Sequence, residues 1–273
     1  MARAAVSLPE ELRRMIARHG ARRLREIESM LDSALRPCVL VTSARVADRP
    51  LRRSAIGRML RLGTASPRLS LTASKFGGTP YTEAADRPWA SDAVFIGQIN
   101  LSEIDDLPDG VPRRGIFAID LVGSTDGFRV RWYPSPSEQE DDPGAVVCLG
   151  THEASMQFRA GWTLPEGSAW EDAVPHEDEE LREAWNEWAP LGDMREECHR
   201  LFGHRSAGLD DHYGFEPPRG RTNDVTEYEM LLRITFDNAA GFSWGTNWTY
   251  VLVHRDDLAE GRLERAVVTG ANY

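Results

Sequence analysis

The chain has 273 residues, of which 41% are hydrophobic and 27% are charged, and this ordinary composition excludes collagen-like and wholly disordered structure. Its net charge is −11, and its 3 widely spaced cysteines exclude a disulfide framework, so we expect a cytoplasmic protein. Apolar runs stay shorter than the ~18 residues of a membrane-spanning helix, so we expect neither a membrane span nor a signal peptide.

The N-terminal part of the chain is predicted to be helical. A capping box and apolar residues at helical spacing predict an amphipathic helix over residues 7–36. A short buried strand is expected at residues 38–42. Residues 44–68 are rich in arginine, with glycine and proline, and we interpret them as an insertion or surface loop.

From residue 69 onward, short strands separated by turns are predicted. The expected strands are residues 94–101, 115–122, 128–133, 155–164, 230–236 and 247–254. Helices are expected over residues 178–191, which carry an apolar stripe, and over residues 194–202, which Gly203 would end. Strands and helices mixed in this way predict an α+β fold, with mixed, largely antiparallel sheets and flanking helices.

The order of elements also predicts an internal duplication of two half-domains. A Phe-Gly pair precedes strands in each half, at Phe76-Gly77 and at Phe202-Gly203. The two halves would be residues 69–165 and 178–273, closing on one core within a single domain over residues 1–273.

Several segments resemble a known family when they are taken in order. They are SKFGGTPY at residues 74–81, FIGQINL at residues 95–101, LPDGVPRRGIFAIDL, and HRLFGH at residues 199–204. Together they resemble the YwqG-like family, a bacterial domain of unknown function. The resemblance covers residues 21–273 and implies an α+β fold with an internal repeat. It implies no established activity.

The first candidate binding segment contains the only lysine of the chain. Lys75 stands among 31 arginines, beside Gly77, Gly78 and Tyr81. An ammonium group next to glycines and hydroxyl groups suits a carboxylate or phosphate, because it differs from guanidinium in size and hydration. The alternative is a tight turn that needs the glycines for positive φ and leaves Lys75 exposed.

The second candidate binding segment is a glycine-containing loop between two predicted strands. Trp244, Asn247 and Trp248 lie in or beside it, and Asp237 precedes it. Aromatic side chains around such a loop form ligand clefts or protein-binding anchors. The alternative is a hairpin whose tryptophans cover the core.

Histidines and aspartates concentrate within fourteen residues of the second half, at His199, His204, Asp210, Asp211 and His212. These residue types bind divalent metals, but their spacing matches no established metal motif, so they are weak metal candidates. We therefore predict no metal and no cofactor, and we assign no catalytic residue.

These observations favour a cytoplasmic binding or protein-interaction module. The acidic charge suggests a basic protein partner, and the sharpest version is an immunity-type neutraliser of that partner. The alternative is a hydrolase or transferase built from Lys75 and the histidines and aspartates of the second half. Residues 1–70 hold 15 arginines against 6 acids, but the net negative charge disfavours nucleic acid.

Overall fold

The computed structural model describes residues 10–17, 21–46, 69–83, 93–122, 127–137, 147–148, 152–165, 179–192, 199–205, 215–241 and 248–271. The helices are α1 (Glu10–Ile16), α2 (Ala21–Ala34), α4 (Glu179–Gly192) and α5 (Arg255–Ala259), with single 3-10 turns η2 (Leu101–Glu103), η5 (Val225–Glu227) and η6 (Leu263–Arg265). The strands are β1 (Arg36–Arg45), β2 (Lys75–Phe76), β3 (Ala93–Asn100), β4 (Ile116–Val122), β5 (Phe128–Tyr133), β6 (Val147–Cys148), β7 (Ala154–Thr163), β8 (His199–Phe202), β9 (Tyr228–Ile234), β10 (Trp248–His254) and β11 (Val267–Ala271).

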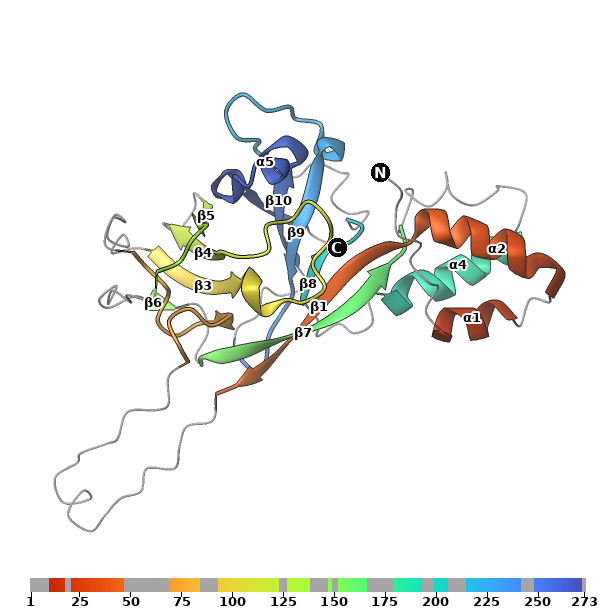
Figure 1. Ribbon diagram of the computed structural model, residues 1–273, viewed down its shortest axis with the longest axis horizontal. Helices are drawn as coiled ribbons and strands as arrows, with labels where there is room; N and C mark the ends of the chain where they lie inside the picture. The colour runs from red at the N-terminus through yellow and green to blue at the C-terminus, as the bar shows by residue number, and fades with distance from the viewer. Residues whose placement is uncertain are drawn as a thin grey trace, which may run out of the picture.

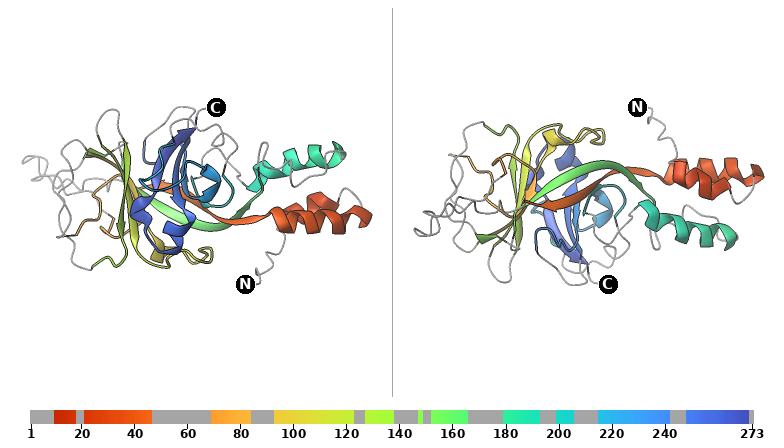
Figure 2. Two further views of the ribbon diagram at one scale, coloured as in Figure 1. Left: turned by 90° about the horizontal axis from the view of Figure 1, so that it is seen from above. Right: turned by 90° about the horizontal axis from the view of Figure 1, so that it is seen from below.

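All of these strands belong to one sheet. Ten of them follow the order β11-β10-β9-β8-β1-β7-β2-β3-β4-β5, with antiparallel pairing throughout, while β6 pairs with β3 in parallel. The strands at the two ends of this order, β5 and β11, lie close to each other. The sheet therefore curls into a nearly closed barrel (Figures 1 and 2).

The antiparallel pair β1–β7 is the longest pairing in the sheet. It is continuous over ten residues, from Arg36 opposite Thr163 to Arg45 opposite Ala154. β8 pairs with the other edge of β1, and β2 pairs with the other edge of β7. This central pair therefore joins the strands that precede residue 148 to those that follow residue 199.

The interior of the curled sheet is apolar. Alternate residues of a strand point to opposite faces, so one face of each strand can fill the interior. Its fully buried members include Val41, Phe76, Leu201, Leu231 and Val251. Smaller apolar clusters lie around Tyr81 in the first half and around Tyr228 in the second half.

The helices α1, α2 and α4 form a second core of their own. Leu12, Leu31, Trp185 and Trp188 are buried together there, and the indole N–H of Trp185 donates to the carbonyl of Pro165 at 3.1 Å. Figures 1 and 2 show the three helices side by side beyond one end of the β1–β7 pair. They extend the molecule at one end and do not cover the sheet.

The predicted fold class is therefore wrong. The molecule is mostly a single antiparallel, nearly closed sheet, and it is not a mixed α+β fold with flanking helices. The expected helices at 7–36 and 178–191 exist, as α1, α2 and α4. However, they bury their apolar faces against one another, so they are not available to flank the sheet.

Two local predictions are corrected as well. Residues 199–202 were expected in a helix, but they form β8, which lies between β1 and β9 with all four residues buried. Pairing on both edges and burial on both faces outweigh the local helical pattern. Of the predicted loop 44–68, residues 44 and 45 belong to β1, and residues 47–68 lie outside the described part of the chain.

Candidate functional site

The candidate site is built around β2, the two-residue strand that contains Lys75. β2 lies between β3 and β7, with Lys75 opposite Gln98 and Ser155, and with Phe76 one position further along. Consecutive residues of a strand point to opposite faces. Phe76 belongs to the interior cluster, so Lys75 faces the outer side of the sheet, where its side chain is nevertheless 0% exposed.

Polar side chains of β3 hold the segment that leads into β2. The amide of Gln98 donates to the carbonyls of Leu71 and Ala73 at 2.6 and 2.9 Å, and its oxygen accepts from the N–H of Tyr81 at 2.7 Å. The amide of Asn100 donates to the carbonyl of Thr72 at 3.0 Å. Residues 71–73 are therefore held in place by polar side chains of the FIGQINL strand.

Glu153, which directly precedes β7, is the acidic partner of Lys75. The Lys75 Nζ lies 3.8 Å from a Glu153 carboxylate oxygen and donates to the carbonyl of Ser70 at 2.9 Å. The other Glu153 carboxylate oxygen accepts from the N–H of Leu69 at 3.3 Å, and its backbone carbonyl accepts from the N–H of Val46 at 2.9 Å. One residue thus anchors both Val46 and Leu69.

Gly77 and Gly78 turn the chain tightly at the end of β2, with φ values of +62° and +72°. A Cβ atom at Gly78 would lie 2.4 Å from a carboxylate oxygen of Glu153, and one at Gly77 would lie 2.7 Å from the carbonyl oxygen of His152. At both positions the positive φ disfavours any other residue, and at Gly77 the backbone carbonyl of His152 also leaves no space for a side chain. The glycines let the backbone approach the carboxylate closely.

On the interior side of β2, the ring of His199 packs against the ring of Phe76, with centroids 4.5 Å apart and the planes tilted by 52°. Its Nε2 lies 2.9 Å from the carboxylate of Asp237, and its Nδ1 accepts from the N–H of Thr235 at 3.2 Å. An Nδ1 that accepts carries no proton, so the neutral ring donates from Nε2 to Asp237.

Burial lowers the pKa of His199, although the Asp237 carboxylate opposes this effect. Burial alone would raise the pKa of Asp237, but hydrogen bonds from His199, Ser43 and Ala240 outweigh it and lower that pKa. A neutral imidazole beside a charged carboxylate is the stable state of this pair at neutral pH.

A backbone contact connects the two halves of the candidate site. The N–H of His152 donates to the carbonyl of Ala240 at 3.1 Å, and the N–H of Ala240 donates to the Asp237 carboxylate at 2.8 Å. The glycine turn after β2 and the turn at residues 237–241 therefore meet at residues 152–153. We call the exposed or partly exposed residues here the rim: Gly78, His152, Glu153, Asn238 and Ala239.

Four of the predicted binding residues, Lys75, Gly77, Gly78 and Asp237, converge at or directly behind the rim. Tyr81 lies on the outer face, where its hydroxyl donates to Glu83 at 2.9 Å and accepts from the N–H of Ser137 at 2.7 Å. Trp248 begins β10 opposite Ala271. Trp244 and Asn247 lie outside the described residues.

The two candidate metal residues within the described ranges, His199 and His204, are not brought together. His199 pairs with Asp237, whereas the Nε2 of His204 lies 2.6 Å from the carbonyl of Ala34, at the end of α2. Asp210, Asp211 and His212 lie outside the described residues. Within the described ranges, no group of three or more histidine, cysteine or acidic residues could hold a metal ion.

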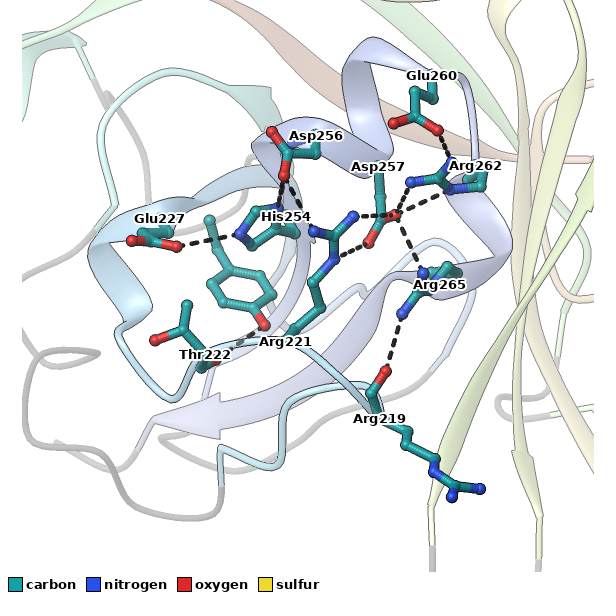
Figure 3. Close-up of polar contacts among 11 residues, drawn as sticks. Arg219, Arg221, Thr222, Glu227, His254, Asp256, Asp257, Glu260, Arg262 and Arg265 are labelled. Atoms are coloured by element: carbon teal, nitrogen blue, oxygen red, sulfur yellow. Dashed lines mark hydrogen bonds and ion pairs between the residues drawn. The ribbon is translucent and has the colours of Figure 1, made fainter.

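Sequence reasoning missed Glu153 and His152 at the rim, and it missed a polar network in the second half. That network surrounds Asp257 of α5, whose side chain is fully buried (Figure 3). Arg221 contacts both carboxylate oxygens at 2.7 and 3.0 Å, Arg262 contacts one at 2.7 and 2.9 Å, and Arg265 lies at 3.5 Å. Burial would raise the pKa of Asp257, but the hydrogen bonds from Arg221 and Arg262 lower it.

Comparison with known proteins gives a family and no activity. The family model described as "Domain of unknown function (DUF1963)" matches residues 74–270, from the residue before Lys75 almost to the end of β11. No curated protein matches the chain. None of the helices in the described ranges combines the length and the apolar character that crossing a bilayer requires.

Proposed function

The chain belongs to the DUF1963 family, and on that premise we propose that it is a binding protein without catalytic activity of its own. Within the family we assign it to the YwqG-like proteins, because the segments SKFGGTPY and FIGQINL resemble theirs. The proposal treats residues 1–273 as one domain and places the protein in the cytoplasm, in keeping with its sparse cysteines.

The observation that carries this proposal is the bonding of His199. A general base needs a ring nitrogen that can face a reactant. In His199 one nitrogen accepts from Thr235 and the other donates to Asp237. Lys75 is fully buried on the opposite face of the sheet, so the two groups do not face one substrate. Both side chains hold the rim in place, which suits binding better than catalysis.

We propose that the partner is a basic protein that contacts the rim. The chain carries 43 acidic residues against 32 basic ones, and an excess of negative charge speeds association with a basic partner. In its sharpest form, the protein is an immunity-type neutraliser of a basic toxin.

The test is affinity capture of a basic protein by the tagged full chain, followed by calorimetric titration with that protein in purified form. We expect stoichiometric binding. For the immunity-type role, we also expect co-expression to protect cells from the captured protein. Co-purification of a metabolite or metal without a protein would instead favour the hydrolase or transferase.

A matched pair of variants locates the contact. Asn238 lies on the rim and Asn223 lies elsewhere, and both are exposed. Asn238→Arg is expected to weaken partner binding at least tenfold, about 1.4 kcal/mol, while Asn223→Arg leaves it unchanged. Equal effects of the two substitutions would remove the rim from the proposal.

A further inference from the structure

The carboxylate of Glu153 is held in the way that proteins hold a bound anion. Leu69 donates a backbone N–H to one oxygen at 3.3 Å, and the Lys75 ammonium lies 3.8 Å from the other. The turn at Gly78 brings the backbone against the same carboxylate. A backbone donor, a cation and a close glycine turn are the parts of a carboxylate-binding site.

The identity of residue 75 fits a small, enclosed anion site. The chain has 31 arginines and this one lysine, which is 0% exposed. Ammonium is a compact point charge with three donors, whereas guanidinium is a broad planar fork. The Lys75 Nζ donates a hydrogen bond to the Ser70 carbonyl, and the Glu153 carboxylate lies beside the same ammonium group.

The contact between Glu153 and Lys75 is looser than a buried cation normally has with its ion-pair partner. Its contact with Lys75, at 3.8 Å, is longer than a hydrogen bond and is therefore electrostatic. Its side chain is 13% exposed, whereas that of Lys75 is fully covered. The Glu153 side chain is therefore partly open to solvent, and we expect a ligand to approach from the rim.

We propose that Glu153 is an internal pseudo-ligand in a carboxylate-binding site, and that an external carboxylate displaces it. The incoming group pairs with Lys75 and with the Leu69 N–H, while the Glu153 side chain turns outward into solvent. The ligand class is a carboxylate, either of a small organic acid or of the C-terminus of a peptide. This site goes beyond the proposed contact with a basic protein and does not depend on it.

The single lysine provides a direct test. Acetylation of Lys75 by an amine-reactive ester, followed by mass spectrometry, reports on this one side chain, and an added lysine peptide serves as the internal standard. We expect slow acetylation in the unmodified protein and at least tenfold faster acetylation in Glu153→Ala. Sodium acetate, compared with sodium chloride at equal ionic strength, should slow the reaction of the variant again. Faster acetylation without protection by acetate would overturn the proposal.

Two further variants control for altered folding. Glu153→Gln keeps the size of the side chain and an acceptor for Leu69, so it should fold, react faster than the unmodified protein and gain protection by acetate. Glu103, an exposed acid that accepts from the N–H of Ser74, is the matched control. Glu103→Ala should leave the acetate effect as it is in the unmodified protein. If neither Glu153 variant is protected, the proposal is wrong.

The source of the carboxylate is distinguished on the Glu153→Gln variant, in which Lys75 is open to protection by an added ligand. Short peptides with a free C-terminus are compared with the same peptides carrying a C-terminal amide, and both are compared with acetate. Protection by the free peptides alone assigns the site to a chain terminus, whereas equal protection by acetate assigns it to small acids. Protection by the amidated peptides would contradict a carboxylate site. None of these outcomes depends on whether a basic protein is captured.

Discussion

Lys75 and Asp257 are both charged, and the side chain of each is 0% exposed. The oppositely charged groups around them are nevertheless arranged very differently. Lys75 forms an ion pair with Glu153 at 3.8 Å. Asp257 is contacted by Arg221, Arg262 and Arg265, four of the contacts being hydrogen bonds of 2.7 to 3.0 Å. The first arrangement leaves room for exchange of the anion, and the second does not.

The difference follows from the cost of burying charge. A buried ion loses several kcal/mol of solvation unless close partners replace the water. Asp257 recovers this loss through forked arginine contacts, and its arginines join residue 221 to α5 and η6 (Figure 3). The contacts that offset this loss for Lys75 include a backbone carbonyl at 2.9 Å and the Glu153 carboxylate at 3.8 Å. Dense matching suits a structural role, whereas a longer contact beside the partly exposed rim is what the proposed carboxylate site requires.

The largest effect is expected from breaking the dense network. Asp257→Ala leaves three guanidinium groups directed at an empty position and should lower the free energy of unfolding by about 3 kcal/mol. Urea denaturation measures this loss. A loss below about 1 kcal/mol would mean that the network is replaceable, and the contrast with Lys75 would fail.

Acid is expected to weaken the protein first through two histidines, His199, which is buried, and His204, which is partly buried. Burial lowers the pKa of His199 behind the rim, and burial, together with nearby arginine charges, lowers the pKa of His204 to about 4. With its pKa lowered in the folded state, a histidine is protonated first in the unfolded chain. Stability is therefore full above pH 6.5 and falls as the pH drops toward 4. The contribution of His204 is about 3 kcal/mol at most, measurable by urea unfolding at stepped pH.

The Asp257 network should respond at lower pH. The pKa of its carboxyl is lowered from 3.8, so its contribution is present above that value and is lost only as the pH falls through the lower, folded-state pKa. His204→Gln keeps a donor for Ala34 and should remove the part of the loss between pH 6.5 and 4 that comes from His204, while the part from His199 stays. An unchanged profile in this variant would assign the loss to other groups.

A smaller effect is expected at Lys75. Lys75→Met keeps an unbranched apolar stem and leaves Glu153 facing solvent from the rim, so the loss should be about 1–2 kcal/mol in urea unfolding. A loss as large as that of Asp257→Ala would show that the Lys75 pair is as structural as the arginine network.

The smallest effect is expected at Asp256, next to Asp257 in α5. It bonds Arg221 at 3.0 Å, but its side chain is 63% exposed. Exposed ion pairs contribute about 0–1 kcal/mol, so Asp256→Ala should change stability by no more than that. Comparing Asp256→Ala with Asp257→Ala therefore separates the effect of burial from the presence of an arginine contact.

The sequence predicted many of the elements and mispredicted their assembly. Residues 128–133 alternate apolar and basic side chains and form β5 as expected, and the expected strand at 94–101 corresponds to β3. The order of the strands in the sheet depends on pairings such as that of Cys38 with Gly161. These residues are more than a hundred positions apart, and local sequence patterns do not encode such pairings. β2 and β8 are too short for a periodic signal and owe their conformation to their neighbours.

The candidate site was predictable only in part. Lys75, Gly77 and Gly78 stood out by composition, and the structure explains each by its contact with residues 152–153. Glu153 carried no signal, because an isolated acid before a strand has no distinguishing pattern. The pairing of His199 with Asp237 joins positions 38 residues apart through the fold alone.

The position of β1 at the centre of the sheet has a consequence for synthesis. β1 is among the first strands to leave the ribosome, but its two neighbours are β7 and β8, whose residues begin at 154 and 199. Both edges of this apolar strand therefore lack their hydrogen-bonded neighbours while more than a hundred further residues are added. Contacts this distant in sequence close slowly, and unpaired edges invite association with other chains. We expect the nascent chain to need protection by chaperones until β8 has emerged.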